Sequence, residues 1–285
     1  MGQAPNSLGT APPRLQAPPN ACDCHMHVYD ADRFPPPRPR SRMTANALVA
    51  DYRLFQQRIG TSRVVVVTPA AYHTDNEVTL DAIAQIGSQA RGVAVAHPTV
   101  SDAELKRMAA GGIRGIRFSQ FDPNTASTTQ DMIEPLARRV EPLGWHVQIH
   151  FRADQIVAAA DLLGRLPGTI VFDHMGRLRQ EAGINDPAFG VICRLLDAGR
   201  AWVKLSGAYL LASAPDYAAA APIARAFIAA APERMVWGSD WPHPTEHEKP
   251  DDAVLFDLLS VWAPDAATRQ RILVDNPAAL YGFSN

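Results

Sequence analysis

Short runs of apolar, often β-branched residues recur along the chain, and stretches with helical periodicity separate them. The separating stretches, for example residues 48–59 and 223–231, carry apolar residues three and four positions apart, which is typical of amphipathic helices. Eight of the short runs are expected to be strands, namely residues 21–29, 63–68, 92–97, 113–119, 146–151, 169–175, 201–207 and 235–240. The pattern therefore predicts a regular alternation of strands and helices.

This alternation predicts parallel strands joined by crossover helices. Eight such units in roughly 260 residues match a closed (β/α)8 TIM barrel better than an open doubly wound sheet. No glycine-rich phosphate loop follows any of the runs, which disfavours a nucleotide-binding sheet. Two more helical stretches, residues 253–262 and 265–280, follow the last run. We therefore predict an α/β fold with one barrel domain over residues 21–285 and extra C-terminal helices.

The first twenty residues differ from the rest of the chain, because they lack hydrophobic periodicity and are rich in proline. The prolines are Pro5, Pro12, Pro13, Pro18 and Pro19. Residues 1–20 are therefore expected to form an extended N-terminal arm that carries no chemistry.

The composition excludes several classes of protein. The chain has 285 residues, of which 47% are hydrophobic, and a net charge of −2, so it has the apolar surface for a sizeable core and does not resemble a disordered protein. The balanced charge predicts no nucleic-acid or acidic-membrane partner. No apolar run approaches the ~18 residues of a membrane span. With three cysteines and no recognisable signal peptide, we expect a cytoplasmic protein and leave homo-oligomerisation open.

Side chains that bind metals or transfer protons end four of the expected strands. They are His25 and His27, His150, His174, and Asp240. Active sites of this fold lie at the C-terminal ends of the strands, and residues two apart in a strand point to the same face. A single strand histidine is usually a hydrogen-bonded core residue. Four coincident strand ends instead favour a functional cluster, because buried polar groups without partners are costly.

The residues around this cluster form four motifs that resemble a known family. The motifs are Asp23-Cys24-His25-Met26-His27-Val28, Gly112-Ile113-Arg114-Gly115-Ile116-Arg117-Phe118, Val171-Phe172-Asp173-His174-Met175-Gly176-Arg177 and Val236-Trp237-Gly238-Ser239-Asp240-Trp241-Pro242-His243. They are similar to those of the amidohydrolase superfamily, and more narrowly to its lactonase branch. The resemblance implies a barrel fold, lactone chemistry, and Asp240 as the group that transfers protons.

The resemblance also implies a mononuclear metal site. In the superfamily, a paired-histidine motif, a fifth-strand histidine and an eighth-strand aspartate hold one divalent ion, which here predicts His25, His27, His150 and Asp240 as ligands. This donor set suits Zn²⁺. A water activated by the metal would open the lactone, with Asp240 as general base and then acid, and His174 or the metal would polarise the carbonyl.

Four further residues are expected to bind a small lactone that carries a carboxylate or sulfonate. Arg117 is in phase with Gly115 and Ser119, and we take it to point into the barrel, where its guanidinium matches such an anion. The remaining three, Arg177, Tyr209 and His243, lie in loops after the sixth, seventh and eighth strands.

Three alternatives to a metal-dependent lactone hydrolase stay open. Metal-independent lactonases of this branch carry a tyrosine where this chain has His150, and lactone isomerases carry asparagine in place of Asp240. Keeping Asp240 favours hydrolysis. A third alternative is a non-oxidative decarboxylase of the same superfamily, which would release CO2 rather than open a ring.

Overall fold

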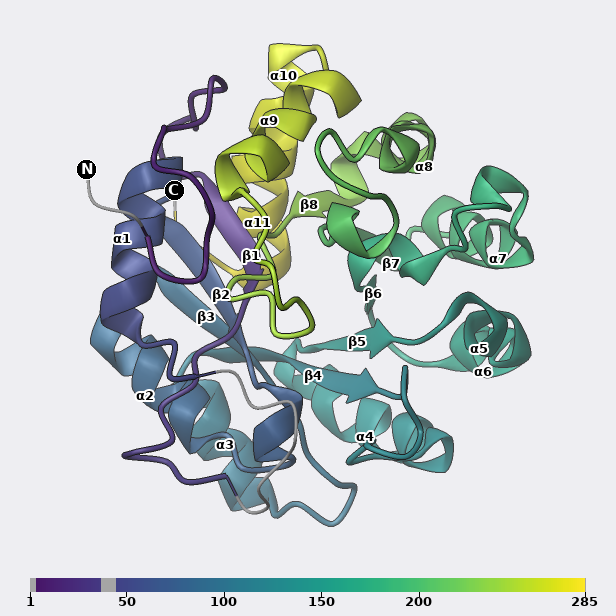
Figure 1. Ribbon diagram of the computed structural model, residues 1–285. Coiled ribbons are helices and arrows are strands. Elements are labelled where there is room, and N and C mark those ends of the chain that lie inside the picture. Colours follow the sequence, from purple (N-terminus) through teal and green to yellow (C-terminus); the bar gives the residue numbers. More distant parts are fainter. Residues whose placement is uncertain (1–3, 37–44, 285) are drawn as a thin grey trace.

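The computed structural model describes residues 4–36 and 45–284. Its centre is a barrel of eight parallel strands in the order β1 to β8, surrounded by helices (Figure 1), and this confirms the predicted (β/α)8 fold. All eight predicted strands are present: β1 (Cys22–Met26), β2 (Arg63–Val67), β3 (Ala90–Ala94), β4 (Ile113–Ser119), β5 (His146–His150), β6 (Ile170–Phe172), β7 (Ala201–Leu205) and β8 (Met235–Trp237).

Helices follow each strand and end the chain. They are α1 (Val49–Ile59), α2 (Glu77–Ile86), α3 (Asp102–Ala110), α4 (Ile133–Val140), α5 (Ala153–Ala158), α6 (Ala160–Arg165), α7 (Pro187–Asp197), α8 (Ala221–Ala230), α9 (Asp252–Trp262), α10 (Ala266–Gln270) and α11 (Asn276–Tyr281). The helix expected over residues 265–280 is interrupted, because a π-helical turn, Arg271–Asp275, separates α10 from α11. No helix in the described ranges is long and apolar enough to cross a membrane.

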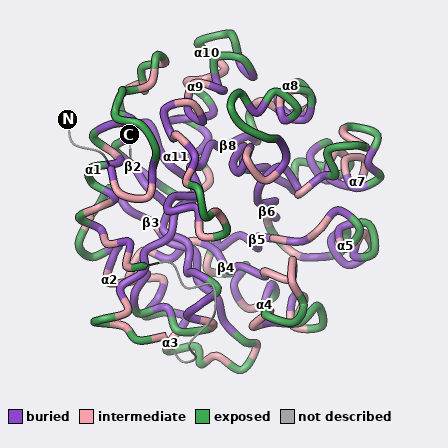
Figure 2. The backbone as a smooth tube through the Cα atoms, viewed as in Figure 1, coloured by how far each residue is buried: buried purple, intermediate pink, exposed green. Residues whose placement is uncertain are grey.

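The strands are buried on both faces, as the colouring in Figure 2 shows. On β2, Val64 and Val66 pack in the layer between the strands and the helices, whereas Val65 and Val67 belong to a second cluster with Cys22 and residues of β3, β6 and β8. This second cluster fills the barrel interior. Continuous apolar runs are typical of parallel strands with two buried faces.

Strand β1 is irregular where it reaches the site. The pairing of β1 with β2 shifts register between Asp23 and Met26. Asp23 is buried and accepts hydrogen bonds from the Ser239 amide (2.9 Å), the Ser239 hydroxyl (2.6 Å) and the Tyr52 hydroxyl (2.9 Å). Burial raises the pKa of Asp23 to about 6, although these hydrogen bonds oppose the shift. The carboxylate therefore connects β1 to the loop after β8 and to α1.

The N-terminal arm is held against the barrel by the buried Arg58 of α1. Its guanidinium donates to the Ser7 hydroxyl (2.9 Å) and to the carbonyl oxygens of Leu8 (2.7 Å) and Ala11 (2.9 Å), and it pairs with Asp251 at 2.5 Å. Residues 1–3 of the expected arm lie outside the described residues.

The arm also contacts the loop that follows β8. The carbonyl oxygen of Pro5 accepts a hydrogen bond from the Trp241 indole at 2.8 Å, and the amide of Leu15 donates to Asp257 at 2.8 Å. Trp241 directly follows Asp240, so the arm packs on the backbone that carries a predicted catalytic residue.

We expect the variant Arg58→Met to lower the free energy of unfolding by about 2 kcal/mol, because it removes the donor to the buried Ser7 hydroxyl and to two part-buried carbonyl oxygens, and it breaks the ion pair with Asp251. Urea denaturation measures the change, and limited proteolysis reports release of the arm. The control is Arg53→Met on the exposed side of the same helix, where Arg53 donates to the Gln85 carbonyl oxygen, and it should change stability by less than about 0.5 kcal/mol. Equal stabilities of the two variants would contradict this account.

Candidate active site

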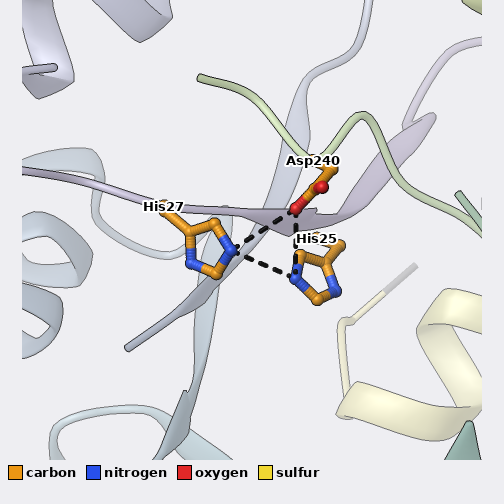
Figure 3. A group of neighbouring side chains, drawn as sticks. All are labelled: His25, His27 and Asp240. Atoms are coloured by element: carbon orange, nitrogen blue, oxygen red, sulfur yellow. Dashed lines mark hydrogen bonds and ion pairs between the residues drawn. The ribbon is translucent and has the colours of Figure 1, made fainter. Parts of the chain in front are cut away.

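Three of the predicted residues converge at the C-terminal end of the barrel (Figure 3). The Nε2 atoms of His25 and His27 lie 3.3 Å apart, and Oδ1 of Asp240 lies 3.5 Å from the first and 3.4 Å from the second. All three side chains are buried. The atoms therefore form a nearly equilateral triangle of possible metal ligands.

The backbone brings these residues together where the barrel closes. The amide of Asp240 donates to the carbonyl oxygen of His25 at 2.7 Å, and the amide of His27 donates to the carbonyl oxygen of Trp241 at 2.8 Å. Gly238 permits this close approach, because a Cβ there would lie 2.9 Å from the backbone nitrogen of His25. Asp240 has a φ of 63°, in the left-handed region that aspartate tolerates better than most residues.

The triangle fits a divalent metal ion with tetrahedral ligands. Ligands that are 2.0–2.1 Å from Zn²⁺ at tetrahedral corners lie about 3.3–3.4 Å from one another, which matches the three distances above. The Nδ1 atom of His27 lies 2.8 Å from the Val67 carbonyl oxygen. A carbonyl oxygen only accepts, so Nδ1 carries the proton and Nε2 presents a lone pair, as a metal ligand must.

The second nitrogen of His25 faces two groups of opposite charge. Its Nδ1 lies 3.3 Å from Oδ1 of Asp173 and 3.3 Å from Nζ of Lys204. When Nδ1 donates to Asp173, the lone pair of Nε2 is free for a metal. When Lys204 donates to Nδ1, Nε2 carries a proton that it can donate to His27 or Asp240. Burial and the Lys204 charge hold the pKa of His25 well below its usual value, so the ring is neutral in both arrangements.

His174 lies beside His25 at the same end of the barrel. The ring centroids are 4.8 Å apart, and Nδ1 of His174 lies 2.9 Å from the Ser206 hydroxyl. Burial lowers the pKa of His174 to about 4, although Asp240 and Asp173 oppose the shift. His174 is therefore a neutral hydrogen-bonding group at neutral pH.

His150 lies farther from the metal-ligand triangle. Its Nδ1 lies 2.8 Å from the Ser119 hydroxyl, its ring stacks on Phe121, and its centroid is 5.3 Å from that of His174. Within residues 4–36 and 45–284, the compact groups of possible ligands are His25, His27 and Asp240, and His25, Asp173 and His174. The role of His150 as a fourth ligand stays a prediction.

Arg117 points into the barrel, as the strand phase predicts, but its charge is already paired. Its side chain is 5% exposed, and its Nε donates to Oδ2 of Asp173 at 2.9 Å. The same carboxylate oxygen accepts from the Gln148 amide at 3.1 Å, and Lys204 donates to Oε1 of Gln148 at 2.7 Å. These four side chains form a buried network directly beside His25.

Three members of this network, Asp173, Gln148 and Lys204, were not among the predicted site residues. A usable signal was present for two of them: Asp173 immediately precedes His174 in its motif, and Lys204 is a lone charge in an otherwise apolar strand.

The charges of the buried network stabilise one another. Burial alone would raise the pKa of Asp173. His25, Arg117 and Lys204 outweigh this effect and hold the pKa well below its usual value, so the carboxylate stays ionised.

A cleft of about 750 Å³ opens beside this cluster, lined by loops that follow β4 to β8. Arg177 and Tyr209 both line it. The Arg177 guanidinium lies 4.2 Å from the centre of the Phe121 ring, and within the described part of the chain it has no hydrogen bond or ion pair. An unpaired guanidinium in a cleft is suited to bind an anionic group.

His243 does not reach the cleft, contrary to the expectation that it binds substrate. Its ring is fully buried, its Nε2 lies 3.1 Å from both carboxylate oxygens of Asp252, and its edge packs on Tyr209. The carboxylate at the start of α9 draws the ring into the protein. His243 therefore supports Tyr209, whose hydroxyl donates to Oδ2 of Asp240 at 2.5 Å.

Comparison with known proteins agrees with this geometry. The sequence model of a family described as Amidohydrolase matches residues 22–283. The chain is 34% identical to a 4-sulfomuconolactone hydrolase from Rhizobium radiobacter, covering 96% of this chain and 93% of the relative. It is 34% identical to a 2-pyrone-4,6-dicarboxylate hydrolase from Comamonas testosteroni (94% and 92%), and 30% identical to a D-galactarolactone isomerase from Agrobacterium fabrum (100% and 98%). The chain therefore belongs to the amidohydrolase family of enzymes.

Proposed function

We propose that this enzyme hydrolyses a small lactone that carries a carboxylate or sulfonate group. The observation that carries the proposal is the Asp240 carboxyl, whose Oδ1 lies 3.4–3.5 Å from two histidines beside a cleft lined by Arg177. Burial alone would raise the pKa of Asp240, but His174, His27 and His25 hold it well below its usual value. The names of two relatives describe hydrolysis of lactones with sulfonate or carboxylate groups, which supports the same class.

In the proposed mechanism, Asp240 accepts a proton from the water that attacks the lactone carbonyl. It returns this proton to the ring oxygen as the carbon–oxygen bond breaks. His174 donates a hydrogen bond from Nε2 to the carbonyl oxygen, where negative charge develops. In this mechanism the Ser206 hydroxyl, 2.9 Å from Nδ1, acts as the donor, which keeps the His174 proton on Nε2. Arg177 binds the anionic group of the substrate.

His25, His27 and Asp240, with His150 as the expected fourth ligand, would hold one divalent ion, most simply Zn²⁺. When bound, the metal supplies Lewis acidity, which makes a neighbouring water more acidic and polarises the carbonyl. A metal-independent lactonase is the second candidate, and the contact of Lys204 with Nδ1 of His25 favours it. In that case His25 would donate a hydrogen bond from Nε2, and His27 would accept one at its Nε2.

Protein purified without chelator is expected to contain about one divalent ion per chain, and chelation should lower turnover. Elemental analysis measures the metal. The variant His27→Asn should lose it, while His97→Asn should keep it, because His97 is exposed and bonds to the Ser127 carbonyl. Full activity of metal-free protein would refute the metal site and support the second candidate.

The variant Asp240→Asn should reduce kcat by at least ~10²-fold, because an amide cannot accept the proton. Asparagine also tolerates the left-handed backbone of this position, so circular dichroism should show an unchanged fold. Steady-state kinetics on a lactone of the proposed class measures the effect. A variant that keeps most of its kcat would disprove the role of Asp240.

The variant Arg177→Met should lower kcat/KM for an anionic lactone by ~10- to 100-fold and leave a neutral lactone of equal ring size nearly unaffected. The control is Arg138→Met, since Arg138 is exposed on α4 and paired with Glu134. Arg117→Met is expected to impair both substrates, because it leaves Asp173 without its partner. Equal losses for both lactones in Arg177→Met would show that Arg177 does not bind the anion.

A further inference from the structure

Tyr209 contacts the predicted catalytic carboxylate directly. It lies in a short helical turn, Ala208–Leu210, that follows β7, and its hydroxyl donates to Oδ2 of Asp240 at 2.5 Å. The other oxygen of the same carboxylate, Oδ1, faces His25 and His27. The two oxygens of Asp240 are therefore divided between the tyrosine and the histidine pair.

This contact leaves the Tyr209 hydroxyl poorly suited to bind the anionic group of a substrate. A phenol has one proton to donate, and here Asp240 accepts it. The oxygen that remains offers only lone pairs, which repel a carboxylate or sulfonate. Tyr209 lines the cleft, but its hydroxyl proton is donated to Asp240.

We infer that Tyr209 is a positioning residue that fixes the rotation of the Asp240 carboxylate, an inference that rests on the proposed function of Asp240. A carboxylate held at Oδ1 alone can rotate about its Cβ–Cγ bond. A second hydrogen bond at Oδ2 fixes the plane of the group, and Oδ1 then stays directed at the histidine pair. Small misplacements of a reacting group cost large factors in rate.

The surroundings of Tyr209 are built to hold the ring in place. Its ring centroid is 5.1 Å from that of His243, and the rings pack edge to face. His243 in turn is locked by both oxygens of Asp252 at 3.1 Å. On the other side, Gly207 has a φ of 65°, and a Cβ there would lie 3.0 Å from Nδ1 of His174. The turn that presents Tyr209 thus packs closely on a second predicted catalytic residue.

The test is the variant Tyr209→Phe, which keeps the ring and its packing and removes only the hydroxyl. We expect kcat to fall by ~10- to 100-fold while KM changes by less than about threefold, because the substrate does not bind the hydroxyl. The control is Tyr281→Phe. Tyr281 is buried in the cluster of Cys22 and Val65 in the barrel interior, and its hydroxyl has no hydrogen bond in the described structure. Its loss should leave both constants unchanged.

A double variant shows whether Tyr209 acts through Asp240. In Asp240→Asn, adding Tyr209→Phe should cause no further loss of kcat, because residues that act as one unit are not additive. A rise in KM beyond threefold, an unchanged kcat, or an additive double variant each overturns the inference. If Asp240→Asn alone stays active, the proposed function fails. If it is inactive and Tyr209→Phe is fully active, only the inference about Tyr209 fails.

Discussion

The site depends on how the last strand of the barrel meets the first. Only a few main-chain hydrogen bonds join them, and two of these link His25 to Asp240 and His27 to Trp241. Asp23 reinforces the junction by accepting three hydrogen bonds from Ser239 and Tyr52. His25 and His27 lie on the β1 side of this junction and Asp240 lies on the β8 side. Any slip between β1 and β8 would therefore separate the two histidines from the carboxylate.

Local patterns were enough to predict the barrel and the central cluster. Strand and helix periodicity is a property of neighbouring residues, and the position of His25, His27 and Asp240 at strand ends follows from the chain direction alone. The buried network could not be predicted in this way. Lys204 and His25 are 179 residues apart, and their contact depends on how the whole barrel closes. It also depends on the register shift in β1, which no sequence pattern predicts.

Sequence patterns say least about the loops, where side-chain direction is set by distant partners. His243 follows Asp240 by three residues and was expected at the substrate, yet Asp252 at the start of α9 turns it away. Tyr209 was expected to bind substrate, and its hydroxyl donates to Asp240. Several loop residues, among them His174, Arg177 and Asp240, also have positive φ values. Such strained backbone is maintained only where the surrounding structure enforces it, and it concentrates here at the ends of β6 and β8.

The charges within the site bear on the anionic substrate proposed above. Arg117 and Lys204 both pair with Asp173, so the two cations and the two carboxylates of Asp173 and Asp240 leave the buried cluster nearly neutral. Arg177 then adds one unpaired positive charge at the wall of the cleft. A divalent metal would add further positive charge in the same low-dielectric region, where uncompensated charge is costly. In the proposed function, the anionic group of the lactone would offset the local charge of Arg177 and of the metal, although Glu246 and Glu248 also line the cleft.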